Sequence, residues 1–195
     1  MQKRNLYRTI YLLTIALCVA VDQWTKQLIR LNFKLGETHS LLPGVLSFTY
    51  SENDGALGGL FSNQRWVFMV FSTIALLVLS LYLFRGVSYL ADRRADGTFP
   101  PIDFLCGIAL SLIVGGGIGN MVDRLSPRAV VVDFIHVPIV KMINFGSFPP
   151  TLEDFPIFNG ADSCVTVGAT LLIVYLIITL FRSKKDKKER EESPK

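Results

Sequence analysis

Two aspartates stand in surroundings that suit acid-base chemistry. Asp133 lies within VVVDFI, where branched and aromatic neighbours and the lack of an adjacent cation raise a carboxyl pKa. Asp162 lies within FNGADSCV, with Asn159 three residues earlier as a predicted hydrogen-bonding group at a helix start. Two such acids that share a proton can activate water and protonate or polarise a scissile carbonyl. We therefore predict Asp133 and Asp162 as a catalytic pair, with helix capping as the alternative role of Asp162.

Other polar residues have spacings that predict supporting contacts. Asp22 and Lys26 are four apart with the acid first, which places them on one helix face as an ion pair. They are either a structural pair or a means of positioning a loop or a substrate backbone. The side-chain amide of Asn53 can both donate and accept a hydrogen bond, and the small residues Gly55 and Ala56 that follow it let another chain approach. The same spacing also fits an ordinary turn.

The stretch GGGIGNMVDR combines close packing with charge. Its first and fifth residues, Gly115 and Gly119, form a GxxxG pair, which indicates a face for a neighbouring helix. Asn120, Asp123 and Arg124 follow at i, i+3 and i+4 on one face. We predict that Arg124 neutralises Asp123 and that this pair acts as a scaffold.

Other chemistries have little support in the sequence. His39 lies in a polar loop, and His136 has no second histidine or cysteine at ligand spacing, so no metal or cofactor is expected. Cys18, Cys106 and Cys164 lie in apolar blocks and are interpreted as small buried hydrophobic residues. A GxSxG motif and a Cys-His arrangement are also missing, which disfavours covalent catalysis.

The elements that must position these residues are predicted to be membrane helices. The chain has 195 residues, half of them hydrophobic, and a mean hydropathy of +0.41. Backbone groups cannot stay unpaired in lipid, so each long apolar block must be helical. We predict an all-α membrane protein, a single domain over residues 1–182 built as a four-helix bundle, with helices at about 7–28, 66–84, 104–122 and 164–181.

The connections carry the remaining predictions. Residues 32–64 alternate around LLPGVLSFTY and then show turn signals, which indicates a small extracytoplasmic β-element. Residues 123–162 form a second outer loop with an amphipathic segment. The tail over 183–195 is a charge run, predicted to be disordered.

Orientation follows from the 20 basic residues. Three precede the first helix, three lie between the second and third, and seven follow the fourth, whereas seven are spread over the two longer connections. Because positively charged flanks stay in the cytoplasm, both termini are predicted to be cytoplasmic. The basic, apolar N-terminus is similar to a secretory signal, but no small-x-small site ends its apolar run, so we expect it to stay as a helix.

The order of the motifs VDQWTK, ENDGA, GGGIGNMVDR, VVVDFIHV and FPIFNGAD resembles the lipoprotein signal peptidase family, or signal peptidase II. The resemblance implies a four-helix aspartic endopeptidase of the bacterial inner membrane. It would cut prolipoprotein signal peptides before a cysteine that carries diacylglycerol, with Asp133 and Asp162 as catalytic residues. The supporting or substrate-binding positions implied are Asp22, Lys26, Asn53, Gly55, Asn120, Asp123, Arg124, Asn159 and Ala161.

The resemblance also implies partners and a location. The partners are diacylglyceryl-modified prolipoproteins and membrane lipids, with no nucleic acid, and the active site lies at the outer face. One chain holds a full set of site residues, which favours a monomer. Two departures are visible: Asp54 stands where the family usually has Thr, and the 138–157 segment looks longer than usual, either as a lid or as a surface excursion.

Two other functions fit parts of the sequence. A small proton-coupled transporter also places acids in membrane helices, but it would need them near the bilayer midplane and an inverted repeat, which we do not find. A structural scaffold would leave the isolated Asp133 without a role.

Overall fold

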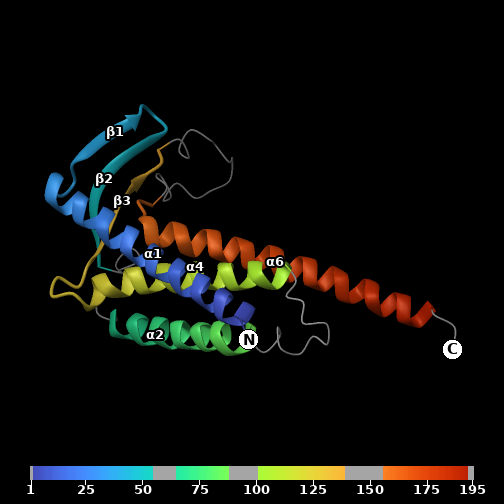
Figure 1. The fold of residues 1–195 in the computed structure, drawn as a ribbon. Coiled ribbons are helices and arrows are strands. Elements are labelled where there is room, and N and C mark those ends of the chain that lie inside the picture. The colour runs from blue at the N-terminus through green and yellow to red at the C-terminus, as the bar shows by residue number, and fades with distance from the viewer. Residues whose placement is uncertain (1, 55–64, 88–100, 139–155, 193–195) are drawn as a thin grey trace.

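The computed structural model describes residues 2–54, 65–87, 101–138 and 156–192, and these contain four long helices and a three-stranded sheet (Figure 1). Gly55 and most of the 138–157 segment lie outside the described residues. The elements in chain order are α1 (Gln2–Asn32), β1 (Thr38–Leu42), β2 (Leu46–Asn53), α2 (Arg65–Leu81), the π-helix η2 (Tyr82–Val87), α4 (Pro101–Leu125), β3 (Val131–His136) and α6 (Gly160–Glu192).

The four helices confirm the predicted membrane architecture. The helices α1, α4 and α6 each contain a stretch of 18 residues or more that is long and apolar enough to cross a bilayer, and α2 forms such a stretch together with η2. The helices α1, α2 and α6 leave most of their apolar side chains exposed, as expected for surfaces that face lipid, and α4 is the most buried of the four. The central helix of the bundle is therefore α4, which contacts α1, α2 and α6.

Glycines let the helices around α4 approach closely. A Cβ on Gly115 would lie 2.8 Å from the Cβ of Cys18, and a Cβ on Gly119 would lie 2.7 Å from Oδ2 of Asp22. The predicted GxxxG face is thus confirmed, and its neighbour is α1. Along the contact between α4 and α6, Gly168 of α6 packs against the Ala109 carbonyl of α4.

The sheet is antiparallel with the strand order β1-β2-β3. The predicted β-element is the β1–β2 hairpin, whose turn uses Pro43 and a Gly44 with φ of 74°, a conformation that glycine adopts without strain. The third strand, β3, was not predicted. It joins the sheet from far along the chain and sets Asp133 opposite Ser51 of β2.

The sheet is fastened to the end of α1 by a small apolar core of Ile29, Tyr50, Val132 and Phe134. Figure 1 shows the sheet at one end of the bundle and both chain termini at the other end. A second core, near the termini, is formed by Tyr11, Leu83, Cys106, Leu110 and Tyr175. The α helices thus hold β3, and with it Asp133, at one end of the bundle.

One boundary prediction was wrong. The tail over 183–195 was predicted to be disordered, but α6 continues as a helix to Glu192. The reason is local, because Lys, Arg and Glu, which dominate this stretch, are good helix formers and can extend an existing helix without a new nucleation step.

Candidate functional site

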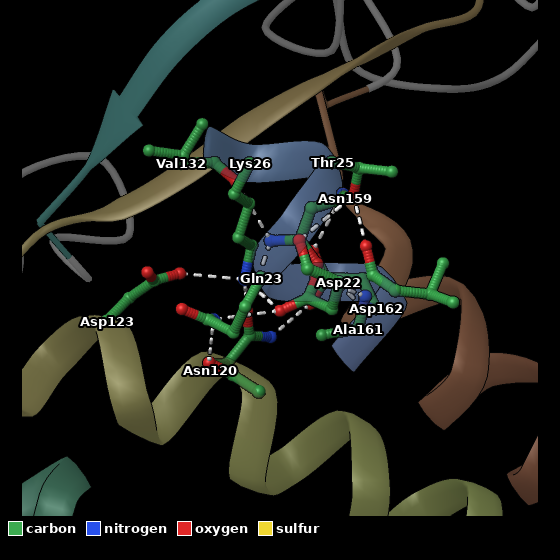
Figure 2. Close-up of polar contacts among 12 residues, drawn as sticks. Asp22, Gln23, Thr25, Lys26, Asn120, Asp123, Val132, Asn159, Ala161 and Asp162 are labelled. Atoms are coloured by element: carbon green, nitrogen blue, oxygen red, sulfur yellow. Dashed lines mark hydrogen bonds and ion pairs between the residues drawn. The ribbon is translucent and has the colours of Figure 1, made fainter. Parts of the chain in front are cut away.

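The polar residues predicted from the sequence meet at the sheet end of the bundle. Figure 2 shows Asp22 and Lys26 from α1, Asn120 and Asp123 from α4, and Asn159 and Asp162 at the start of α6 turned toward one another. Most of these side chains are buried although they are charged or polar. Buried polar groups are stable only when they are paired, and the contacts below supply the partners.

The start of α6 is a reciprocal capping box. The backbone N–H of Asp162 donates to Oδ1 of Asn159 (2.9 Å), and the backbone N–H of Asn159 donates to Oδ2 of Asp162 (3.2 Å). The predicted cap at Asn159 is therefore confirmed, and so is the capping role of Asp162. Capping uses Oδ2 of Asp162 and leaves Oδ1 for other partners.

The side-chain amide of Asn159 links this cap to the sheet. Its Nδ2 lies 2.6 Å from Oδ1 of Asp133 and 3.1 Å from Oδ1 of Asn120. The same residue thus donates to Asp133 through its side chain and to Asp162 through its backbone. Asn159 is fully buried, so this bridge between the two predicted catalytic acids is fixed in place.

Asp133 is held among amide donors, and no Lys or Arg of the described residues forms an ion pair with it. Asn53 Nδ2 donates to its Oδ2 (3.0 Å), and the side chain is only 3% exposed. Burial raises the pKa of Asp133 to about 6, against the lowering effect of the Asn53 bond and with a further raising effect from Asp162. The predicted upward shift in the pKa of Asp133 is therefore confirmed, and its main cause is desolvation.

Lys26 is the centre of the second half of the network. Its Nζ lies 2.7 Å from Oδ2 of Asp22, 2.7 Å from Oδ2 of Asp123 and 2.9 Å from Oδ1 of Asn120. The contacts with Asp22 and Asn120 are hydrogen bonds, whereas the contact with Asp123 is an ion pair, because Oδ2 of Asp123 accepts no hydrogen bond from the described residues. The predicted Asp22–Lys26 pair is confirmed, and the structure adds Asp123 and Asn120 to it.

The predicted partner of Asp123 was wrong. Its carboxylate is paired with two cations of α1, Lys26 and Arg30, whose Nη2 lies 3.1 Å from Oδ1 of Asp123. Arg124 follows Asp123 directly on α4, and successive residues of a helix point in different directions, so it takes no part in this pair among the described ion pairs. The packing of α1 against α4 decides the pairing instead.

Two further contacts tie α1 to the other helices. Oδ1 of Asp22 accepts the backbone N–H of Ala161 (2.8 Å), in the first turn of α6, where a helix favours a negative charge. Gln23 Nε2 donates to the Gly119 carbonyl (3.0 Å) and to Oδ2 of Asp22 (3.2 Å). Asp22 thus holds the start of α6 in register with α4.

Sequence reasoning missed Arg30 and Gln23. A signal for Arg30 is present, because Asp22, Lys26 and Arg30 follow one another at intervals of four and so share one stripe of α1. No comparable pattern indicates Gln23. Of the predicted residues, the structure brings together Asp22, Lys26, Asn53, Asn120, Asp123, Asp133, Asn159, Ala161 and Asp162. Arg124 takes no part in the described contacts among them, and Gly55 is outside the described residues.

The last contact joins the two halves of the network. Asn120 Nδ2 donates to Oδ1 of Asp162 (2.7 Å), while Oδ1 of Asn120 accepts from Lys26. The cations lie on the Asp22 and Asp123 side, and within the described part of the chain no Lys or Arg comes within ion-pair distance of Asp133 or Asp162. Two neighbouring acids without a cation form a chemical setting for proton transfer.

Comparison with known proteins agrees with this arrangement. The family model described as Signal peptidase (SPase) II matches residues 14–178. A lipoprotein signal peptidase of Lactobacillus gasseri is 37% identical over 179 residues, which are 92% of this chain and 97% of that protein. A lipoprotein signal peptidase of Streptococcus pyogenes is 37% identical over 169 residues, covering 87% of this chain and 93% of the relative.

Solved structures give the same result for the fold. A bacterial membrane enzyme determined by the in meso method at 1.9 Å resolution superposes with a TM-score of 0.67 at 30% identity, over 86% of this chain and 92% of that one. A second, at 2.3 Å resolution, gives 0.66 at 28% identity over 96% and 94%. From its matched motifs, its four membrane helices and its relatives, this chain belongs to the signal peptidase II family and is a multi-pass membrane peptidase.

Proposed function

We propose that this peptidase removes the signal peptides of prolipoproteins by cleaving before the diacylglyceryl-modified cysteine, with Asp133 and Asp162 as an aspartic dyad. One observation carries the proposal: Asn159 donates to both carboxylates, through its side chain to Asp133 and through its backbone to Asp162. An amide that is bound to both acids holds them at a fixed separation, as general acid-base catalysis requires. The family and the relatives support the substrate.

The distribution of charge supports the dyad. Asp22 and Asp123 are matched by Lys26 and Arg30, so this part of the network is neutral. Its acids are compensated and suit a structural role. Among the described residues, the hydrogen-bond donors to Asp133 and Asp162 are neutral amides, so ionising both acids is costly and one shared proton is favoured.

The surroundings of the two acids suggest different roles. Asp133 is buried, and its raised pKa favours the protonated form more than in a solvated aspartate, which suits the acid that protonates the scissile carbonyl or the leaving amine. Asp162 is half-buried and accepts N–H bonds from Asn120 and Asn159, which suits the carboxylate that takes a proton from the attacking water. The tetrahedral intermediate then breaks down as the amine of the modified cysteine leaves with a proton.

The position of the dyad fits a lipidated substrate. The acids lie near the sheet end of the bundle, away from both termini (Figure 1). With the basic flanks in the cytoplasm, this end is the outer face of the inner membrane, where the acyl chains of the substrate remain in the outer leaflet while the peptide reaches water. All the proposed residues come from one chain, which supports action as a monomer.

The test compares three aspartates in cleavage of a diacylglyceryl-modified prolipoprotein. Asp133→Asn and Asp162→Asn keep the side-chain volume but remove the acid-base function, so each is expected to abolish cleavage per folded enzyme. The double variant is expected to be no worse than either single variant. Asp123→Asn is expected to lower the melting temperature and reduce turnover without abolishing it in the molecules that remain folded.

Unlipidated precursor is the control for substrate class, and it should not be cut. Full turnover by Asp133→Asn, or a stable Asp123→Asn enzyme with no turnover, would show that the dyad has been assigned to the wrong pair. Cleavage of the unlipidated precursor at the same rate would refute the role of the diacylglyceryl group.

A further inference from the structure

Arg30 stands out because it is a partly buried cation that no part of the proposed chemistry uses. Its side chain is 19% exposed, and its Nη2 lies 3.1 Å from Oδ1 of Asp123, which is 1% exposed. Its Nε is buried and has no hydrogen-bond partner among the described residues. An unsatisfied buried donor is unfavourable for stability, so the arginine is not explained as a simple structural tie.

We propose that Arg30 is a positioning residue for the reaction, acting through Asp123, Lys26 and Asn120 on Asp162. The inference rests on the proposed function, because it assigns Arg30 to the dyad described above. The chain of contacts has four steps, each of them given by the structure: Arg30 to Asp123 (3.1 Å), Asp123 to Lys26 (2.7 Å), Lys26 to Asn120 (2.9 Å) and Asn120 to Asp162 (2.7 Å).

The first step is a matter of charge. Without Arg30, the two buried carboxylates of Asp22 and Asp123 would share the single cation Lys26. With Arg30 in place, Asp123 is compensated from a second side, and Lys26 can keep its third donor on a neutral acceptor, Oδ1 of Asn120. Removal of Arg30 strengthens the electrostatic attraction between Asp123 and Lys26, because the uncompensated carboxylate is the stronger acceptor. The hydrogen bond from Lys26 to Asn120 is weakened as a result.

The second step is the orientation of an amide. Asn120 can donate to Asp162 only while its Oδ1 faces Lys26 and Asn159. An amide that loses the lysine donor is held at its Oδ1 by Asn159 alone, so it rotates more easily and its N–H bond to Asp162 weakens. Since such a donor favours the ionised form of a carboxylate, the dyad keeps its proton to higher pH, and loss of the positive charge acts in the same direction.

Other charged and titratable groups face these side chains. The dyad is approached by Lys26 from α1, by Asn120 from α4 and by Asn53 from β2. On the sheet side of Arg30, Tyr50 lies within electrostatic range of both Arg30 and Arg128, and its hydroxyl donates to Glu52 (2.7 Å). Arg128 is exposed and makes no described ion pair with Asp123, so it is a matched control for charge without contact.

The experiment measures kcat and KM against pH with a diacylglyceryl-modified prolipoprotein, per folded enzyme, for wild type, Arg30→Met, Arg30→Gln, Arg30→Lys and Arg128→Met. Arg30→Met and Arg30→Gln are expected to move the acid limb of kcat about half a pH unit higher, a loss of roughly threefold in kcat below the limb, with KM unchanged. Arg30→Lys restores the charge and is expected to bring the acid limb of kcat most of the way back to its wild-type pH. Arg128→Met should coincide with wild type.

If Arg30 is purely structural, its replacement would lower the melting temperature and leave the acid limb of the kcat–pH profile of the folded enzyme unchanged. That result would overturn the inference. An equal shift of the acid limb in Arg128→Met would also overturn the inference, because the effect would then come from long-range electrostatics and not from the contact with Asp123. Asp162→Asn is measured in the same assay. If it cleaves, the dyad itself is wrong; if it is inactive and the Arg30 variants match wild type, only the role of Arg30 fails.

Discussion

Replacement of Lys26 by Met is the sharpest test of the buried network. Methionine has a similar length and no charge, so the change leaves the helix intact and removes the cation. Lys26 is fully buried, and it contacts Asp22, Asp123 and Asn120 at 2.7, 2.7 and 2.9 Å. All three acceptors lose a donor at once in a place that water does not reach.

The expected loss follows from the partners that remain. Asp123 keeps Arg30, and Asp22 keeps the N–H of Ala161 and the amide of Gln23, so Asp22 alone loses its only ion-pair partner among the described residues. Breaking a buried ion pair by removing one partner costs about 3 to 5 kcal/mol in the free energy of unfolding. For a domain of this size, that loss corresponds to a fall in melting temperature of roughly 6 to 20 °C.

The assay is thermal unfolding in detergent at fixed pH, with Lys34→Met as the matched control because Lys34 is exposed. Lys34→Met should melt within about 2 °C of wild type, since exposed charges contribute little. The double variant Asp22→Asn/Lys26→Met should recover part of the loss, because it no longer buries an unpaired carboxylate. A melting temperature for Lys26→Met equal to that of the control would refute the account of the network.

Three further outcomes are expected. Gly119→Ala should destabilise the protein and impair cleavage, because its Cβ would lie 2.7 Å from Oδ2 of Asp22. Gly160→Ala is the control and should melt near wild type, because a Cβ there meets nothing closer than 3.6 Å. Equal melting temperatures for the two variants would contradict this expectation. The pKa of Asp133 is raised from 3.8 to about 6, so the folded state binds the extra proton between these values and stability falls as pH rises through this window, by roughly 3 kcal/mol. Asp133→Asn should remove this dependence and melt higher than wild type at neutral pH, and a lower melting temperature would count against it. In a cysteine-free background, a cysteine at exposed Ser40 should react with a membrane-impermeant thiol reagent in right-side-out vesicles, and a cysteine at Ser183 should not. Labelling at Ser183 and none at Ser40 would show that the topology is inverted.

Much of the architecture is local and was predictable. Apolar runs of bilayer length must become helices, and the intervals of Asp22 to Lys26 and of Asn159 to Asp162 place each pair on one helix turn or cap whatever the rest of the chain does. The isolation of Asp133 among apolar neighbours also indicated its raised pKa. In each case the partners are within four residues or the environment is set by the immediate neighbours.

The tertiary structure decided what the sequence left open. Asp123 takes its cations from α1, where Arg30 is 93 positions away, rather than from the adjacent Arg124, because only helix packing determines which side chains share a buried space. The strand β3 exists because β2 offers it an edge, and nothing in VVVDFI alone shows this pairing. The amides of Asn120 and Asn159 can each bond in two directions, so their roles depend on the partners that the packed helices and the sheet bring within about 3 Å of them.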